Sequence, residues 1–302
     1  MKGTALIQYP AFRAWQTMQE RSNNSIVALA IGASLAEQEM ARSTHPAGTA
    51  GAVLAGVTQA ERLNVTATDA KRIFKTATED MAFLAIPQVV ALHIELCVGT
   101  VIECQRFQGL IRPHNKPAEW WDVPLLAKTV RFGEPETTAD HLMKFCVKLR
   151  NTIMHGAGKV DDKLIQAWSG LPKAAKTRWE ALARRPFTYA RVGALPDLRW
   201  PEVMATLAVT KESAHEINAR IGRHLTREQW AQVIAFDYRE GSRHGRRRFN
   251  SKTPGRTVVD ENNQPHAGQE RALQRLQGHA ITYYRPLGMT PDELRTGRDA
   301  IR

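Results

Sequence analysis

Three side chains near the middle of the chain, those of Arg150, Asn151 and His155, are of the types needed to cleave RNA without a metal ion. Such cleavage deprotonates a ribose 2′-hydroxyl, lets it attack the adjacent phosphate and protonates the departing 5′-oxygen. Histidine suits the proton transfers because the unperturbed imidazole has a pKa of about 6.5. Arginine suits the phosphate because its planar guanidinium stays charged and donates paired hydrogen bonds.

The spacing of these residues sets a geometric problem. Asn151 lies four positions before His155, so a helix places the two side chains on one face. Arg150 lies five positions before His155, which leaves them about 140° apart around an ideal helix. Two arrangements would bring them together: the helix ends at Gly156 and lets His155 swing, or a two-fold dimer lines one cleft with both copies of the motif.

The run from Leu149 to Gly156, LRNTIMHG, resembles the signature of the HEPN superfamily, in which an Arg, usually followed by a polar residue, precedes a His with four to six residues between them; here four residues lie between. The resemblance implies a largely helical, commonly homodimeric, metal-independent endoribonuclease of the toxin, anti-phage or RNA-processing kind, with an antitoxin or defence-system partner as one option. It also implies that Glu95, in an apolar helix, faces the motif and supports Arg150.

Each of these roles has a plainer alternative. Arg150 and His155 are also what a basic surface helix end would carry, because the helix dipole favours a cation there. Glu95 is more typical of a glutamate in a surface ion pair. A second Arg–His pair of the same spacing, Arg239 and His244, lacks the Asn and has Gly and Ser in the gap, which is more typical of a loop.

The motif is expected at the end of a well-formed helix. Thr137 with Asp140 predicts the N-terminal cap, and the Gly156-Ala-Gly158 sequence predicts the end. Apolar residues recur at spacings of three and four, which indicates a core-facing stripe, at Leu142, Phe145, Leu149 and Ile153. Arg150 falls off this stripe, so we expect its guanidinium to be free to face a partner.

Helical periodicity elsewhere, without convincing alternating strands, predicts an all-α fold with an HEPN-like bundle. We expect three regions: an N-terminal extension of short helices (1–60), the HEPN-like domain (61–158) and a basic helical region (159–302). Within the domain, Pro87 is expected to end one helix or begin the next, and 88–107 to form a buried helix with His93 and Glu103 on its flanks. Trp120 and Trp121 would pin a loop to the core or stack on bases.

Composition narrows the class of protein. Three cysteines without CxxC spacing, Cys97, Cys104 and Cys146, indicate a reducing, cytoplasmic compartment. The apolar run 26–36 is too short to span a bilayer, so no membrane is expected. The sequence has no P-loop, dinucleotide fingerprint or zinc-ligand spacing, so we expect no cofactor and no bound metal.

The net charge of +12 is concentrated in one half of the chain. Residues 159–302 hold 26 Lys and Arg against 16 Asp and Glu, which is +10 of that total. Such an excess favours a polyanionic partner, which the HEPN resemblance implies is RNA, although a solvated basic surface would look the same. The Thr226–Gln229 capping box predicts an amphipathic helix, followed by a loop that would bind RNA through four arginines, Arg243, Arg246, Arg247 and Arg248.

The competing hypothesis is a non-catalytic nucleic-acid-binding or regulatory protein that uses this basic half. It draws on a loose helix-turn-helix pattern over 201–221, with Ala208 at the turn. The turn glycine usual for that motif is missing.

Overall fold

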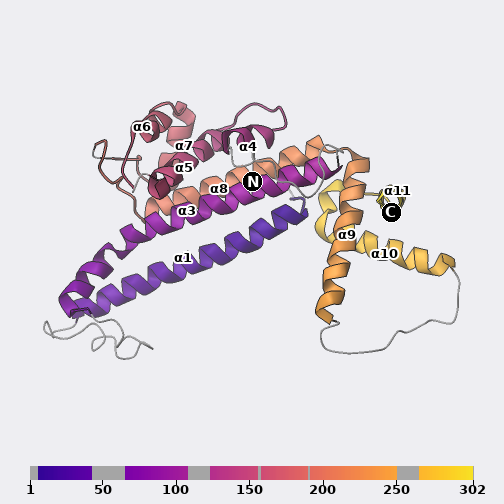
Figure 1. Ribbon diagram of the computed structural model, residues 1–302, viewed down its shortest axis with the longest axis horizontal. Coiled ribbons are helices and arrows are strands. Elements are labelled where there is room, and N and C mark those ends of the chain that lie inside the picture. Colours follow the sequence, from indigo (N-terminus) through magenta and orange to yellow (C-terminus); the bar gives the residue numbers. More distant parts are fainter. Residues whose placement is uncertain are drawn as a thin grey trace. The chain divides into compact units, whose positions relative to one another are not determined.

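The computed structural model is all-α, as the helical periodicity predicts (Figure 1). It describes residues 6–42, 65–107, 123–155, 158–189, 191–249 and 265–301. Within those ranges there is no β-strand, and Tyr189 and Pro196 form an isolated antiparallel bridge. The all-α prediction is confirmed.

The helices follow in chain order. They are α1 (Pro10–Arg42), α3 (Ala67–Phe107), α4 (Val123–Thr129), α5 (Thr138–His155), α6 (Asp162–Ser169), α7 (Lys173–Ala183), α8 (Trp200–His224), α9 (Arg227–Phe249), α10 (Pro265–Tyr283), the 3-10 turn η3 (Arg285–Leu287) and α11 (Pro291–Ala300).

Two long helices correct expectations about the first half of the chain. Within 6–42, the described part of the N-terminal extension, there is one helix, α1, where several short ones were expected. Helix α3 continues through Pro87, so the prediction of a helix boundary there was wrong. Proline removes one backbone hydrogen bond and strains the preceding turn. Its neighbours compensate, because Ile86 and Val90 are fully buried and hold the helix on both sides of the proline.

Helix α8 contradicts the helix-turn-helix interpretation. It runs without interruption from Trp200 to His224, through Ala208, where the turn was expected. Val203, Val209 and Ala214 are fully buried along it, so one apolar face spans both halves of the supposed motif. Without a glycine at the turn, continuing the helix keeps every backbone hydrogen bond.

The chain divides into two compact units, each assembled from distant segments. Unit 1 contains 1–15, 95–135 and 214–302, and unit 2 contains 16–94 and 136–213. Three of the boundaries fall inside α1, α3 and α8. The three consecutive regions expected from the sequence stay a prediction. The motif lies in unit 2, and the basic end of α9 in unit 1.

In unit 2, an aromatic cluster holds α5 against α6 and α7, which lie together in Figure 1. Phe145 of α5 is 1% exposed, and its ring centroid lies 5.2 Å from that of Trp179 at an interplanar angle of 90°. Trp168 and Phe187 lie 5.1 Å and 5.0 Å from the same ring. Edge-to-face aromatic packing of this kind is stabilising and directional. It fixes the helix that carries the motif.

In unit 1, α9 packs closely on α11. Trp230 of α9 is buried, and its ring centroid lies 6.1 Å from that of Tyr284. Gly297 of α11 lies so close to α9 that a Cβ built on it would be 2.4 Å from the carbonyl carbon of Ala231. Glycine at this position is therefore required by the contact and not by backbone freedom.

One helical segment, Asp80–Phe107 of α3, is long and apolar enough to cross a membrane by length and composition, within the residues that the structure describes. Of its apolar 18-residue stretch, 56% is buried inside the protein. A buried core helix passes the same test. The segment therefore has no bearing on where the protein resides.

Candidate active site

Helix α5 begins as the sequence predicts, and its predicted core stripe is buried except at Ile153, which is half-buried. The Thr137 amide donates to Asp140 Oδ2 at 2.9 Å, and the Asp140 amide donates to Thr137 Oγ1 at 3.3 Å. This reciprocal cap satisfies amide groups that the first turn leaves without helical partners. Leu142 and Leu149 are fully buried on the core side. The helix is thus fixed at its start and along one face before the motif begins.

The motif side chains converge at the last turn of α5. Arg150 Nη1 donates to Asn151 Oδ1 at 2.9 Å and lies 3.4 Å from His155 Nε2. The long arginine side chain spans the angular gap that separates the two Cα positions on the helix. The three residues therefore meet within a single chain, so convergence does not require a two-fold partner.

The contact between Arg150 and His155 is a hydrogen bond for only one form of the imidazole. A guanidinium has no acceptor and is always charged, so it approaches Nε2 only as a donor. That geometry suits a neutral His155 with its proton on Nδ1 and its lone pair on Nε2. A neutral imidazole nitrogen in this state is a proton acceptor, which is the form that a general base requires.

Arg150 is less exposed than the sequence suggests. Its side chain is half-buried, and its Nε is buried without a hydrogen-bond partner among the described residues. Met143 and Val147, on the same side of α5, are 7% and 9% exposed. Arg150 is therefore partly buried because α5 is buried on two sides, and the expectation that its guanidinium faces a partner stays a prediction. Partial desolvation strengthens the attraction between this cation and an anionic ligand.

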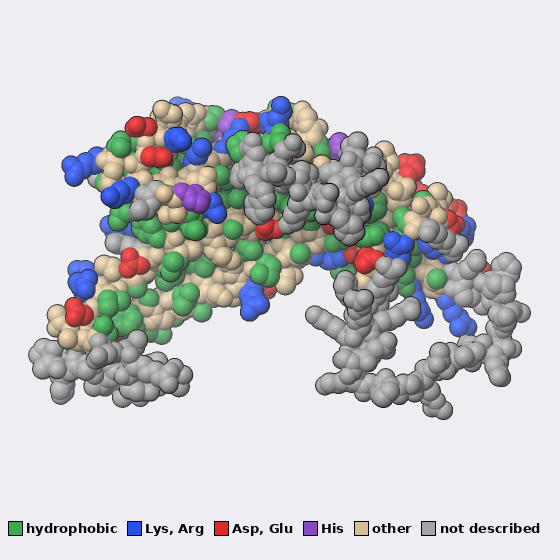
Figure 2. Space-filling model, in the orientation of Figure 1, with side chains coloured by type: hydrophobic (Ala, Val, Ile, Leu, Met, Phe, Trp, Pro, Cys, Tyr) green, Lys and Arg blue, Asp and Glu red, His purple; other side chains and the backbone are tan. Residues whose placement is uncertain are grey.

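The end of the cluster is open to solvent. His155 is exposed, as is Met154, with 53% of its surface accessible. On the face shown in Figure 2, Lys and Arg side chains are spread over α5 to α7 with a few acidic groups between them. A phosphate therefore has access to the cluster, and the surrounding surface carries both charge signs.

The chain leaves the motif through a constrained glycine. Helix α5 ends at His155, and the Gly158 amide donates to the Thr152 carbonyl at 3.2 Å. Gly158 has φ of +74°, and a Cβ there would lie 3.1 Å from Leu195 Cδ2 and 3.2 Å from Phe83 Cε1. Only glycine adopts this positive φ readily and also lacks the Cβ that would crowd Leu195 and Phe83. The predicted glycine-rich end of the helix is confirmed at this position.

The other residues predicted for the site belong to unit 1. Glu95 is exposed on α3, and its proposed support of Arg150 stays a prediction. The four arginines were expected in a loop, and this was wrong because α9 continues to Phe249 and includes all four of them, Arg243, Arg246, Arg247 and Arg248. Their side chains lie outside the described part of the chain, as do Trp120 and Trp121.

A buried polar network in unit 1 was missed by the sequence analysis. Asp237 accepts hydrogen bonds from Arg13 Nη2 at 2.7 Å, His279 Nε2 at 2.9 Å and Tyr284 Oη at 2.8 Å. Burial raises the pKa of Asp237, but the bonds from His279 and Arg13 outweigh it and lower the pKa overall. The spacing 230, 233, 234, 237 places this acid on the buried face of α9, which is a signal that could have found it.

Two residues of α3 that were expected on its flanks are buried instead. Glu103 is 9% exposed: its Oε1 accepts from the Ala11 amide at 3.0 Å, while its Oε2 is buried without a partner among the described residues. Burial raises the pKa of Glu103 to about 8. His93 is 2% exposed, its Nε2 lies 3.2 Å from Ser213 Oγ, and burial lowers its pKa to about 4.

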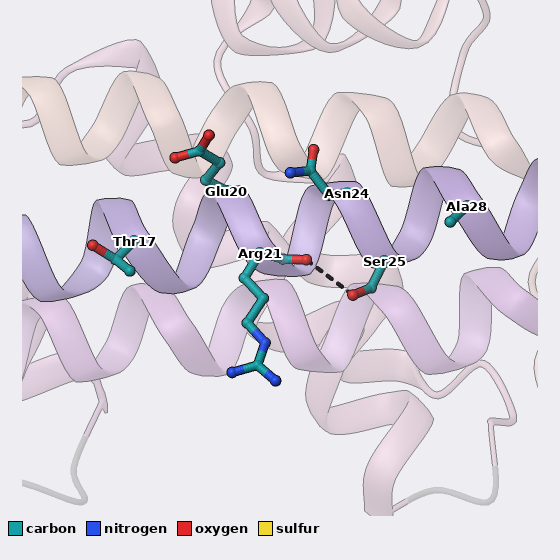
Figure 3. Close-up of a pocket in the computed structure, with 6 residues that line it drawn as sticks. All are labelled: Thr17, Glu20, Arg21, Asn24, Ser25 and Ala28. Carbon is teal, nitrogen blue, oxygen red and sulfur yellow. Dashed lines mark hydrogen bonds between the residues drawn. The ribbon is translucent and has the colours of Figure 1, made fainter.

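Two surface hollows lie away from the motif. One, of about 280 Å³, lies between α10 and α11 and includes Tyr284 and Leu294. The other is a shallow depression along α1, where Figure 3 shows Glu20, Arg21 and Asn24. Within the described ranges, no group of three or more His, Cys, Asp or Glu side chains could hold a metal ion.

Comparison with known proteins adds no relative: no family model, no curated protein and no solved structure matches this chain.

Proposed function

We propose that this protein is a metal-independent endoribonuclease whose reacting groups are Arg150, Asn151 and His155. The observation that supports the proposal is the convergence of the three side chains, with Arg150 Nη1 2.9 Å from Asn151 Oδ1 and 3.4 Å from His155 Nε2. A cation for the phosphate, a proton acceptor for the ribose and an amide that orients the cation thus lie at one exposed helix end.

The chemistry follows from these positions. When a phosphodiester binds, the Arg150 guanidinium turns from His155 to the non-bridging phosphate oxygens, which frees the Nε2 lone pair. Nε2 then takes the 2′-hydroxyl proton, the O2′–P bond forms and the P–O5′ bond breaks. The 5′-oxygen takes a proton from solvent, which reaches this exposed end. The products are a 2′,3′-cyclic phosphate and a 5′-hydroxyl.

Substrate capture is assigned to the basic end of α9. Arg243, Arg246, Arg247 and Arg248 are helical and closely spaced. Replacing the last three by glutamine should weaken RNA binding and reduce its salt dependence, by a slope of up to about 0.7 per lost phosphate contact on a single strand. Cleavage at saturating RNA should persist. Normal binding at every salt concentration would refute this assignment.

Activity in the presence of EDTA tests the main proposal. The wild-type chain should cut single-stranded RNA, and Arg150→Ala and His155→Ala should each lower the rate by about 10²- to 10⁴-fold. Asn151→Ala should lower it less, because the amide orients and does not react. Lys148→Ala, which removes another exposed cation from α5, is the matched control and should retain full activity.

The same assay separates the competing class of function. Binding of RNA or DNA with no cleavage by the wild-type chain would favour a non-catalytic nucleic-acid-binding or regulatory protein. Because α8 is one continuous helix, that alternative has no helix-turn-helix, and any DNA binding would have to use another surface. A role as a toxin or defence effector rests on the HEPN resemblance. Growth arrest on expression of the wild-type chain, absent for His155→Ala, would support it.

A further inference from the structure

Helix α1 carries a stripe of exposed side chains that is uncharged at its centre. We call this the α1 stripe, and its members are Glu20, Asn24, Val27, Ile31, Leu35, Gln38 and Arg42. Val27, Ile31 and Leu35 are 41%, 55% and 60% exposed. No charged residue occurs between Arg21 and Glu37. Figure 2 shows hydrophobic side chains exposed along this part of the protein.

The stripe occupies one face of α1. Steps of three and four residues keep side chains on the same side of a helix, as in the seam of a coiled coil. The opposite face is the one that packs inside the protein, through Trp15, Gln19, Ile26 and Met40. Figure 3 shows the first two members of the stripe, Glu20 and Asn24, on the same side of α1. Three large aliphatic side chains therefore line a helix face that nothing in the described structure covers.

The order of residues in the stripe is symmetric. From Glu20 to Arg42 the steps are 4, 3, 4, 4, 3 and 4 residues, with Ile31 at the centre. A second α1 that runs antiparallel about a two-fold axis at Ile31 therefore meets this face in register. Ile31 then faces its own copy, and Val27 faces Leu35.

The chemistry of the outer pairs is also complementary. The same register places the amide of Asn24 opposite that of Gln38, and the carboxylate of Glu20 opposite the guanidinium of Arg42. Apolar side chains meet apolar ones, amides meet amides, and opposite charges meet at both ends. A two-fold contact uses the same patch on both subunits, so a patch must match its own reverse, and this one does.

We propose that the α1 stripe is a self-association surface on which a second copy of this chain packs antiparallel about Ile31. The proposal does not depend on the nuclease function. The stripe contains none of the motif residues and differs from an arrangement in which two motifs share a cleft. Burial of the three aliphatic side chains from each copy supplies the attraction, and the end charges set the direction.

Sedimentation velocity on the full chain over a range of concentrations tests this surface. The wild-type chain should form a dimer at micromolar concentration. Ile31→Lys puts two like charges at the two-fold axis and should raise the dimer dissociation constant on the order of 100-fold or more. Leu29→Lys is the matched control: Leu29 lies on the same helix and is 63% exposed, but points away from the stripe. It should leave the dimer intact.

Charge reversal tests the antiparallel register. Glu20→Arg should weaken the dimer several-fold, because it faces Arg42 of the second copy, and Glu20→Arg with Arg42→Glu should restore it. Circular dichroism on each variant checks that α1 still folds. A wild-type chain that stays monomeric, or a dimer that Ile31→Lys and Leu29→Lys affect equally, overturns the proposal. Failure of the double reversal to restore the dimer overturns the register.

Discussion

Replacing Glu103 with glutamine should remove most of the loss of stability that we expect of this protein between pH 6.5 and 8. Burial raises the pKa of Glu103 from 4.5 to about 8 in the folded chain. The folded state therefore holds a proton that the unfolded state releases between these two values. Unfolding becomes more favourable as the pH rises through this window, because deprotonation is easier in the unfolded chain.

The size of the effect follows from the window. Each pH unit within it costs about 1.4 kcal/mol of folding free energy. His93 acts in the opposite direction, because burial lowers its pKa from 6.5 to about 4. Below pH 6.5 the unfolded chain binds a proton at His93 that the folded chain does not, so acid destabilises the fold. Above pH 6.5 only Glu103, and not His93, changes the folding free energy with pH. Between pH 6.5 and 8 the wild-type chain should lose about 2 kcal/mol through Glu103.

Urea unfolding followed by circular dichroism at pH 6.5, 7.25 and 8 measures this slope. Glutamine resembles the protonated acid, so Glu103→Gln keeps an oxygen for the Ala11 amide and should flatten the profile. Glu95→Gln, which removes an exposed carboxylate from the same helix, is the control and should keep the wild-type slope. If Glu103→Gln also keeps that slope, Glu103 is ionised in the folded protein and the reasoning fails.

Three further changes probe the packing and the buried charges. Gly297→Ala should destabilise unit 1 by about 1–3 kcal/mol, because the new Cβ meets the α9 backbone at Ala231; an unchanged thermal midpoint would contradict the close contact. Arg185→Met should lower the free energy of unfolding by about 3 kcal/mol or more. It leaves the carboxylate of Glu202, which is 0% exposed and 2.6 Å from Arg185 Nε, without its cation. A loss below about 1 kcal/mol in denaturant unfolding would argue against the pair. The His93→Asn variant should lose less stability than the wild-type chain from pH 6.5 to 4, a difference of up to about 3 kcal/mol that acid titration of unfolding would detect, and parallel profiles would refute it.

Local signals were read correctly from the sequence. Thr137 and Asp140 form the expected cap of α5, and Thr226 and Gln229 form that of α9, with the Thr226 amide 2.9 Å from Gln229 Oε1. A cap involves residues three apart in the chain, so its geometry depends little on the rest of the fold. The all-α class follows for the same reason, since helical periodicity is a local property.

Features that depend on distant packing were not predicted. Pro87 looked like a helix boundary, but the core on both sides of it overrides the local preference. Glu103 and His93 were expected on the flanks of the buried helix, and only the fold shows that α3 is enclosed there.

The candidate site was predicted only in part, for the same reason. The sequence identified the motif and its helix, but helical geometry alone separated Arg150 from His155. Their 3.4 Å approach depends on side-chain torsions that no residue pattern encodes.

The central claim is that His155 activates a ribose 2′-hydroxyl, and the products of cleavage test it most directly. In EDTA, the wild-type chain should cut a defined RNA to give 2′,3′-cyclic phosphate and 5′-hydroxyl ends, identified by mass spectrometry. The same RNA with one 2′-deoxy nucleotide on the 5′ side of the preferred bond should resist cleavage at that bond only. Products with 3′-hydroxyl ends, or unchanged cleavage at the deoxy position, would contradict the mechanism.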